Sequence, residues 1–243
     1  MIVSHDHGLI FLKPQKVAGT SFEIALSRYL GPRDIVTPVV PEDEAVRREA
    51  GYRGAQNDRF APGELLHQRK YKEIAKALLR CRMPRKYFHH IPASAVKRRV
   101  GDRVWADYLK VSIVRNPWDI VVSKFYWDQG RDADIAGLTR WSLANPDFFA
   151  FNRRMYLIDG APVIDHFLRY EQFRDDILTL EEHRPALAGL ADTLAGIRAK
   201  GASRKAGSRD LPAIYADHPK VNALIEESCD YEIARFGYTL AQG

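Results

Sequence analysis

The sequence is poor in cysteine. Of its 243 residues only Cys81 and Cys229 are cysteines, and they lie far apart along the chain. Two such residues cannot form the framework of a disulfide-rich secreted domain, and they provide no cysteine cluster for zinc. This sparse usage is typical of a reducing compartment, so we expect a cytoplasmic protein of the bacterial soluble type.

Long apolar runs are missing as well. No run approaches the ~18 residues that a membrane-spanning helix needs, so we expect no membrane span. The N-terminal stretch "MIVSHDHGLIFLKP" has no basic residues ahead of its short apolar run, which is unlike a signal peptide. We interpret this stretch as the first strand of the fold.

What is present is typical of a soluble globular protein. Hydrophobic residues make up 46% of the chain and charged residues 28%. The formal charge of +6 favours anionic partners, which include nucleotides, nucleic acids, membrane surfaces and acidic glycans. Because no repeat, low-complexity tract or linker interrupts the chain, we expect a single domain over residues 1–243.

Two stretches predict a strand followed directly by a helix. "GLIFLK" (8–13) is a short apolar run closed by Pro14, and helical periodicity runs from Thr20 to the stop at Gly31. The second unit is "DYLKVSIVRNPWDIVVSKFYW" (107–127). In it, Asn116 is suited to cap the helix, with a proline at the first helical position and an acidic residue at the third.

The rest of the chain predicts mostly helices. Residues 33–63 show weak periodicity and predict a long excursion, whereas 64–83 predict a helix and 86–101 a short strand, a turn and a short helix. Further helices are predicted at about 132–143, 145–158, 170–180, 184–200 and 217–236. The fold class is therefore α/β and helix-rich, with a central, mostly parallel sheet flanked by helices.

The turn "QKVAGTS" after the first strand predicts a site for a tetrahedral anion. Gly19 would let the backbone approach a ligand closely, and the amide groups of residues 17–21 would point from the start of a helix. The hydroxyls of Thr20 and Ser21 add donors, and Lys16 adds a full charge. The nucleoside triphosphate loop has the order G-x-x-x-x-G-K-[ST]. Here the lysine precedes the glycine, which argues against an ordinary nucleoside triphosphatase.

This turn resembles the 5′-phosphosulfate loop of sulfotransferases, P-K-[TV]-[GA]-G-[TS]-[ST], with Gln15 in place of the usual proline. The second unit is similar to the family's 3′-phosphate segment, in which an arginine ends a strand and a serine follows eight residues later, as Arg115 and Ser123 do. An offset of eight residues turns ~80° around a helix, so both side chains can reach one phosphate. The alternative is a surface ion pair for Arg115 and an ordinary surface hydroxyl for Ser123.

Two further stretches match the family in outline. "CDYEIARFGY" (229–238) is similar to a C-terminal close common in carbohydrate sulfotransferases, and its aromatic residues are predicted to be core. The stretch at 200–215 has the position of a basic loop that covers the donor nucleotide, with Arg204 and Lys205 as candidates. The chain thus resembles the carbohydrate branch of sulfotransferases that use 3′-phosphoadenosine 5′-phosphosulfate (PAPS), which have a P-loop NTPase-like architecture.

The resemblance implies donor-binding residues and a reaction. A sulfuryl group would pass from PAPS to a hydroxyl or amine of a glycan or small-molecule acceptor, leaving 3′-phosphoadenosine 5′-phosphate (PAP). Lys16 would offset charge on the bridging oxygen without a metal. His90, or else His89, would take the acceptor's proton. The donor-binding residues implied are Lys16, Val17, Ala18, Gly19, Thr20, Ser21, Arg115, Ser123, Arg204 and Lys205.

The acceptor side carries weaker signals. The stretch 67–86 is rich in Lys and Arg, and an acidic acceptor could lie along it, although a solvated helix face gives the same pattern. The basic candidates in this stretch are Lys70, Lys76, Arg80 and Arg82. Trp118 and Trp127 are candidates to stack on adenine or sugar, or else to belong to the core. Two other functions stay open: a P-loop-type small-molecule kinase, and a non-enzymatic binder of an anionic polymer. We expect no nucleic-acid partner.

Overall fold

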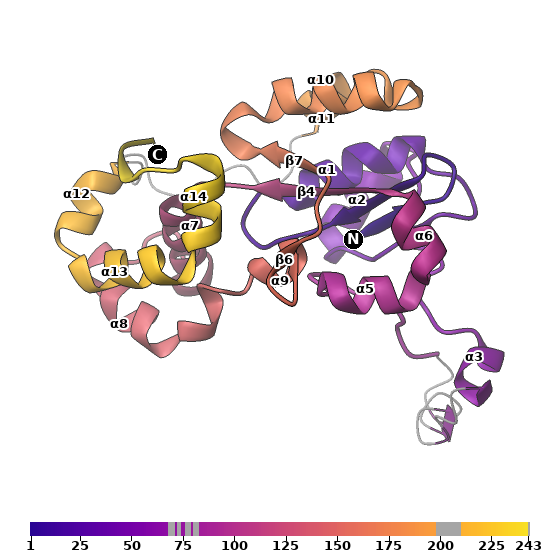
Figure 1. Ribbon diagram of the computed structural model, residues 1–243, viewed down its shortest axis with the longest axis horizontal. Coiled ribbons are helices and arrows are strands. Elements are labelled where there is room, and N and C mark those ends of the chain that lie inside the picture. The colour runs from indigo at the N-terminus through magenta and orange to yellow at the C-terminus, as the bar shows by residue number, and fades with distance from the viewer. Residues whose placement is uncertain (68–70, 72–73, 76–78, 80–82, 198–209, 243) are drawn as a thin grey trace.

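The computed structural model describes residues 1–67, 71, 74–75, 79, 83–197 and 210–242. It has a five-stranded sheet in the order β3-β1-β2-β4-β7 (Figure 1). The strands β2, β4 and β7 are parallel neighbours, whereas β1 is antiparallel to both β2 and β3. The sheet is therefore mixed, and not mostly parallel in its pairings. The strands are β1 (Ile2–Ser4), β2 (Leu9–Leu12), β3 (Ile35–Val36), β4 (Leu109–Val114) and β7 (His166–Arg169).

The N-terminal stretch accounts for the difference. It forms two strands instead of the expected one, because the chain reverses between Ser4 and Leu9 to pair these residues in a hairpin. Gly8 lies in this turn with φ +56°, a left-handed conformation that glycine adopts without steric cost. The hairpin places the antiparallel strand β1 next to β2.

Both faces of the sheet are covered, so β2 is buried at every residue. Leu9 and Phe11 face a core shared with helices α1, α10 and α11. Ile10 and Leu12 face the opposite core, which α5, α6 and α9 complete. In Figure 1 these two helical layers lie above and below the sheet. The helices are α1 (Gly19–Leu26), α5 (Ala93–Val100), α6 (Asp102–Asp107), α9 (Arg153–Tyr156), α10 (Phe173–His183) and α11 (Leu190–Ala195).

A third core lies beyond the carboxyl end of β4, where α7, α8, α12, α13 and α14 pack together (Figure 1). The start of α7 confirms the sequence prediction. The side chain of Asn116 accepts a hydrogen bond of 3.0 Å from the Trp118 N–H, and Pro117 is the first helical residue. These helices are α7 (Pro117–Gln129), α8 (Leu138–Ala144), α12 (Leu211–Ala216), α13 (Pro219–Ser228) and α14 (Asp230–Phe236).

Several segments differ from the sequence predictions. The excursion at 33–63 contains β3 and the helix α2 (Pro41–Glu49), whereas α3 (Pro62–His67) begins at its end and covers the start of the helix predicted at 64–83. The strand expected after residue 86 is absent from the described part of that segment, because the N–H groups of Lys86 and Tyr87 both donate to the carbonyl of Asp58. In place of one helix, the stretch 145–158 holds a 3₁₀ turn (Pro146–Phe148), the short α9 and the start of a hairpin between β5 (Leu157–Ile158) and β6 (Ala161–Pro162).

The predicted helix at 217–236 is two helices, α13 and α14, with Cys229 between them. The edge strand β7 was not predicted at all. None of the helices formed by the described residues combines the length and apolarity that crossing a bilayer requires.

Candidate functional site

The two predicted motifs meet at one edge of the sheet. Since β2 and β4 are parallel neighbours, their carboxyl ends lie side by side, and each is followed by a turn into a helix. Arg115, just after β4, donates a hydrogen bond of 2.7 Å from Nη1 to the backbone carbonyl of Lys16. The turn after β2 and the turn after β4 are therefore joined directly.

The first turn has an unusual backbone. Lys16 and Ala18 adopt left-handed conformations with φ of 61° and 60°, which are uncommon for residues other than glycine. Ala18 directly precedes α1, and Thr20 and Ser21 are half-buried in the first turn of that helix. The side chain of Val17 is fully buried in the core, so only its backbone groups are available to a ligand.

Gly19 has a role that the sequence did not indicate. We expected it to admit a ligand, but the space beside its Cα is filled by the side chain of Lys13. A Cβ at position 19 would lie 2.9 Å from Lys13 Cγ, which is closer than packed carbon atoms approach. The glycine is therefore required by the passage of Lys13 beneath the turn.

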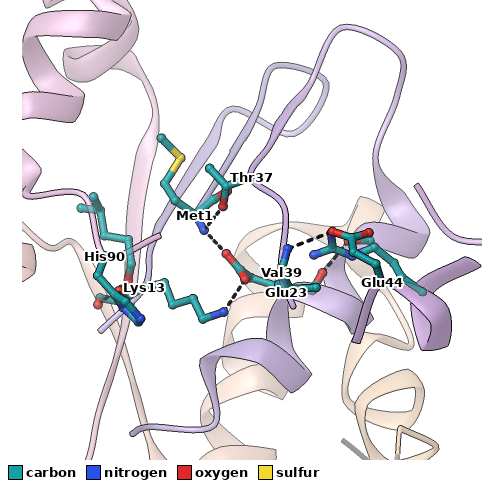
Figure 2. A network of polar contacts seen from close by, with 11 residues as sticks. Met1, Lys13, Glu23, Thr37, Val39, Glu44 and His90 are labelled. Atoms are coloured by element: carbon teal, nitrogen blue, oxygen red, sulfur yellow. Dashed lines mark hydrogen bonds and ion pairs between the residues drawn. The ribbon is translucent and has the colours of Figure 1, made fainter. Parts of the chain in front are cut away.

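Lys13 crosses under the turn to form a buried ion pair (Figure 2). Its Nζ lies 2.7 Å from Oε2 of Glu23 on α1, and the two side chains are 6% and 0% exposed. The other oxygen of Glu23 accepts from the backbone nitrogen of Met1, which also donates to Thr37 Oγ1 at 2.8 Å. This pair fixes the end of β2 to the helix that follows it.

Lys16, in the same turn, is half-buried and its ammonium contacts an aromatic ring. Its Nζ is 4.2 Å from the centroid of the Trp127 ring, on the last turns of α7. The two candidate tryptophans have different environments. Trp118 belongs to the core, where its Nε1 donates to Asn222 Oδ1 at 2.6 Å, whereas Trp127 is 53% exposed.

Arg115 is buried, contrary to the alternative of a surface ion pair. Only 5% of it is exposed, and its Nε lies 2.5 Å from Asp119 Oδ2, which Nη2 also contacts. The guanidinium carbon is 4.1 Å from the centroid of the Tyr170 ring, so the cation stacks on an aromatic face. Ser123 lies on α7, which begins two residues after Arg115, and is 4% exposed.

His90 is connected to the same turn through Lys13. Its Nδ1 lies 2.8 Å from the backbone carbonyl of Lys13. Since a carbonyl can only accept, Nδ1 carries the proton, and Nε2 of the neutral ring has its lone pair available. This is the tautomer that a general base requires.

Burial keeps both candidate histidines neutral. It lowers the pKa of His90 to about 4, although the hydrogen bond to the Lys13 carbonyl acts in the opposite direction. Burial, and next the charge of Lys13, lowers the pKa of His89 to about 3. The centroids of the two rings are 6.1 Å apart. A proton on either ring must overcome both burial and the positive charge of Lys13.

The C-terminal stretch is hydrogen-bonded to the turn after β4, both directly and through Glu171. The hydroxyl of Tyr238 donates to Glu171 Oε2 at 2.9 Å, and Glu171 Oε1 accepts from the Asn116 N–H at 2.7 Å. The side chain of Asn116 also donates to the carbonyl of Thr239. Of the aromatic residues predicted to be core in this stretch, Tyr238 is buried, and Tyr231 and Phe236 are partly buried against the cores.

Arg204 and Lys205 lie outside the described residues, as do all four basic candidates of the 67–86 stretch, Lys70, Lys76, Arg80 and Arg82. In the part of the chain that the structure describes, no group of three or more His, Cys, Asp or Glu side chains is arranged to hold a metal ion.

Sequence reasoning missed three residues that shape the site. Lys13 and Glu23 gave no signal, because a lysine at a strand end and a glutamate on a short helix usually face solvent. Tyr170 follows β7, which was not predicted. The Arg115–Asp119 pair did have a signal in its spacing of four residues, although only Asp119 lies within the predicted helix.

Comparison of the chain with protein-family models, with curated proteins and with solved structures finds no match. The candidate site is thus defined by its residues and their geometry alone.

Proposed function

We propose that the chain is a sulfotransferase with a P-loop NTPase-like architecture, which moves a sulfuryl group from PAPS to a hydroxyl or amine of a carbohydrate or small-molecule acceptor. The observation that carries the proposal is the 2.7 Å hydrogen bond from Arg115 Nη1 to the Lys16 carbonyl. It makes one site of two turns that resemble the two donor-binding segments of that family. Neither resemblance would be sufficient if the turns lay apart.

Each turn has groups suited to one end of the donor. At the first turn, the Lys16 ammonium, the backbone N–H groups of residues 17–21 and the hydroxyls of Thr20 and Ser21 match the 5′-phosphosulfate. At the second turn, the Arg115 guanidinium and the Ser123 hydroxyl match the 3′-phosphate. Asp119 holds the guanidinium on one edge and Tyr170 on one face, so its orientation is fixed before a ligand arrives.

The same groups suit the chemistry of sulfuryl transfer. The acceptor oxygen attacks sulfur while the bond from sulfur to the bridging oxygen breaks, and negative charge grows on the PAP leaving group. Lys16 is the cation that stabilises this charge. His90 Nε2 accepts the acceptor's proton, and the negative charge of a bound donor raises the pKa of His90 from its low resting value.

The direct test is transfer of radiolabelled sulfate from PAPS to a panel of oligosaccharides, lipids and phenols. We expect Lys16→Ala to abolish transfer while the protein stays folded. The matched control is Lys220→Ala, an exposed lysine on α13, which should leave transfer unchanged. If the wild type transfers sulfate to no acceptor on the panel and does not bind PAP, the proposal is wrong.

A second experiment separates the base from the fold. His90→Asn keeps an N–H donor at the position of Nδ1, and asparagine tolerates the left-handed φ of 50° at this residue. We expect turnover to fall by about 10²-fold or more, the usual contribution of a general base, with PAP affinity nearly intact. Full turnover in this variant would assign the proton transfer to another group.

Calorimetry distinguishes the remaining functions. Titration with PAP and with ATP–Mg²⁺ compares a sulfotransferase with a kinase, and tighter binding of ATP–Mg²⁺ would refute the proposal. A polymer binder predicts salt-sensitive binding to heparin that survives Lys16→Ala, without any transfer.

A further inference from the structure

Trp127 is the residue of the site whose position calls for an explanation. It is 53% exposed, whereas the neighbouring aromatic residues of α7, Phe125 and Tyr126, are 2% and 5% exposed. A large apolar ring in that position loses the benefit of burial. Its face is occupied by the Lys16 ammonium, with Nζ 4.2 Å from the ring centroid.

An aromatic ring holds a cation differently from a carboxylate. A carboxylate cancels the charge of an ammonium group and competes with an incoming anion, whereas the ring attracts the ammonium through its quadrupole and keeps the full charge in place. The Arg115 guanidinium contacts an aromatic face too, that of Tyr170, besides its ion pair with Asp119. Both cations of the site therefore lie against aromatic rings.

The contact also limits the motion of the side chain. A lysine has four rotatable bonds beyond its Cα, and ordering it costs up to ~2 kcal/mol of rotamer entropy. When the ammonium already lies against the ring, part of this cost is met before the ligand binds. The helix that carries the ring is held in place, because Trp118 and Val122 on its inner face belong to the core.

We propose that Trp127 is a positioning residue for Lys16: its exposed ring holds the ammonium at the turn after β2, where the anionic end of the donor would bind. The inference rests on the proposed function, since it takes Lys16 to be the residue that binds this anion. Trp127 acts through Lys16 and has no separate contact with the donor in this account.

The test is a double-mutant cycle measured as PAP affinity by calorimetry. Trp127→Leu removes the ring face and Lys16→Met removes the charge while keeping the stem. A cation–π contact at an exposed site is worth about 0.5–1 kcal/mol, so we expect Trp127→Leu to weaken PAP binding by about 2- to 5-fold. In the Lys16→Met background the same substitution should change affinity no further, and Trp127→Phe should restore part of the loss.

An independent readout needs no ligand. The ε-methylene protons of Lys16 lie over the indole and should resonate upfield in the wild-type NMR spectrum, move to ordinary positions in Trp127→Leu, and lie between in Trp127→Phe. Unchanged Lys16 resonances in Trp127→Leu would refute the proposal. So would an equal loss of PAP affinity in the wild-type and Lys16→Met backgrounds, because Trp127 would then act without Lys16.

Failure of the proposed function looks different. In that case Lys16→Met leaves PAP affinity unchanged, or the wild type does not bind PAP at all. Inorganic sulfate then replaces PAP in the same cycle, and additive effects of the two substitutions on sulfate binding would refute the positioning role as well.

Discussion

The buried pair of Lys13 and Glu23 offers the sharpest test of the structure. Glu23→Gln keeps the shape of the side chain and can still accept from the Met1 nitrogen, but it removes the charge opposite an ammonium that is 6% exposed. Breaking a buried ion pair on one side costs about 3–5 kcal/mol, because the remaining charge stays buried. A domain of this kind has a total stability of roughly 5–15 kcal/mol, so the loss is a large part of it.

The assay is urea unfolding followed by circular dichroism, with linear extrapolation to water. The control is Asp107→Asn, which breaks the Arg103–Asp107 pair, whose side chains are 95% and 63% exposed. That change should cost at most ~1 kcal/mol. In a Lys13→Met background the cost of Glu23→Gln should be smaller, since the lysine ammonium is then absent and only the buried Met1 nitrogen still contacts position 23. A cost for Glu23→Gln as small as that of the control would refute our account of the pair.

Three further predictions follow from the same region. The pKa of His90 is about 4 in the folded protein against an ordinary 6.5, so the unfolded chain binds more protons between these values, and stability should fall as the pH drops from about 6.5 to 4. Unfolding measured at several pH values should show a shallower acid decline for His90→Asn than for the wild type; equal slopes would contradict the assignment. Gly19→Ala should lower both stability and PAP affinity, because the new Cβ would lie 2.9 Å from Lys13 Cγ, and Lys13→Met should relieve little of the clash since the stem remains. Arg115→Lys should weaken PAP binding by about tenfold or more, since lysine cannot contact Asp119, the Lys16 carbonyl and a phosphate with one planar fork; unchanged PAP affinity, read by calorimetry, would exclude Arg115 from the donor site.

The sequence predicted those parts of the fold that local chemistry determines. The start of α7 followed from an asparagine cap and a proline at the first helical position, and β2 from an apolar run that ends in proline. The N-terminal hairpin was missed because its strands are short and its turn depends on one glycine. The edge strand β7 was missed because His166 and Arg169 interrupt its apolar pattern, and only pairing with β4 makes it a strand.

The candidate site shows the same division. Positions such as Lys16 and Arg115 were found from local patterns, but their partners come from distant segments. Nothing near Gly19 indicated that a lysine would pass beneath it, and nothing near His90 indicated the carbonyl that would fix its tautomer. Contacts of this kind depend on the tertiary fold, so a pattern in one segment cannot specify them.

The hydrogen bond from Arg115 to the Lys16 carbonyl also constrains the amide on the other side of that peptide unit. In a trans peptide the C=O and the following N–H point in opposite directions. Because Arg115 donates to the carbonyl oxygen of Lys16, the N–H of Val17 points away from the guanidinium. Rotation of this single peptide plane would remove a donor from the first turn and a partner from the second together. Under the proposed function, binding of the 5′ end and of the 3′-phosphate of the nucleotide would therefore be cooperative. An analogue that lacks either phosphate should bind more weakly than the sum of its remaining contacts implies.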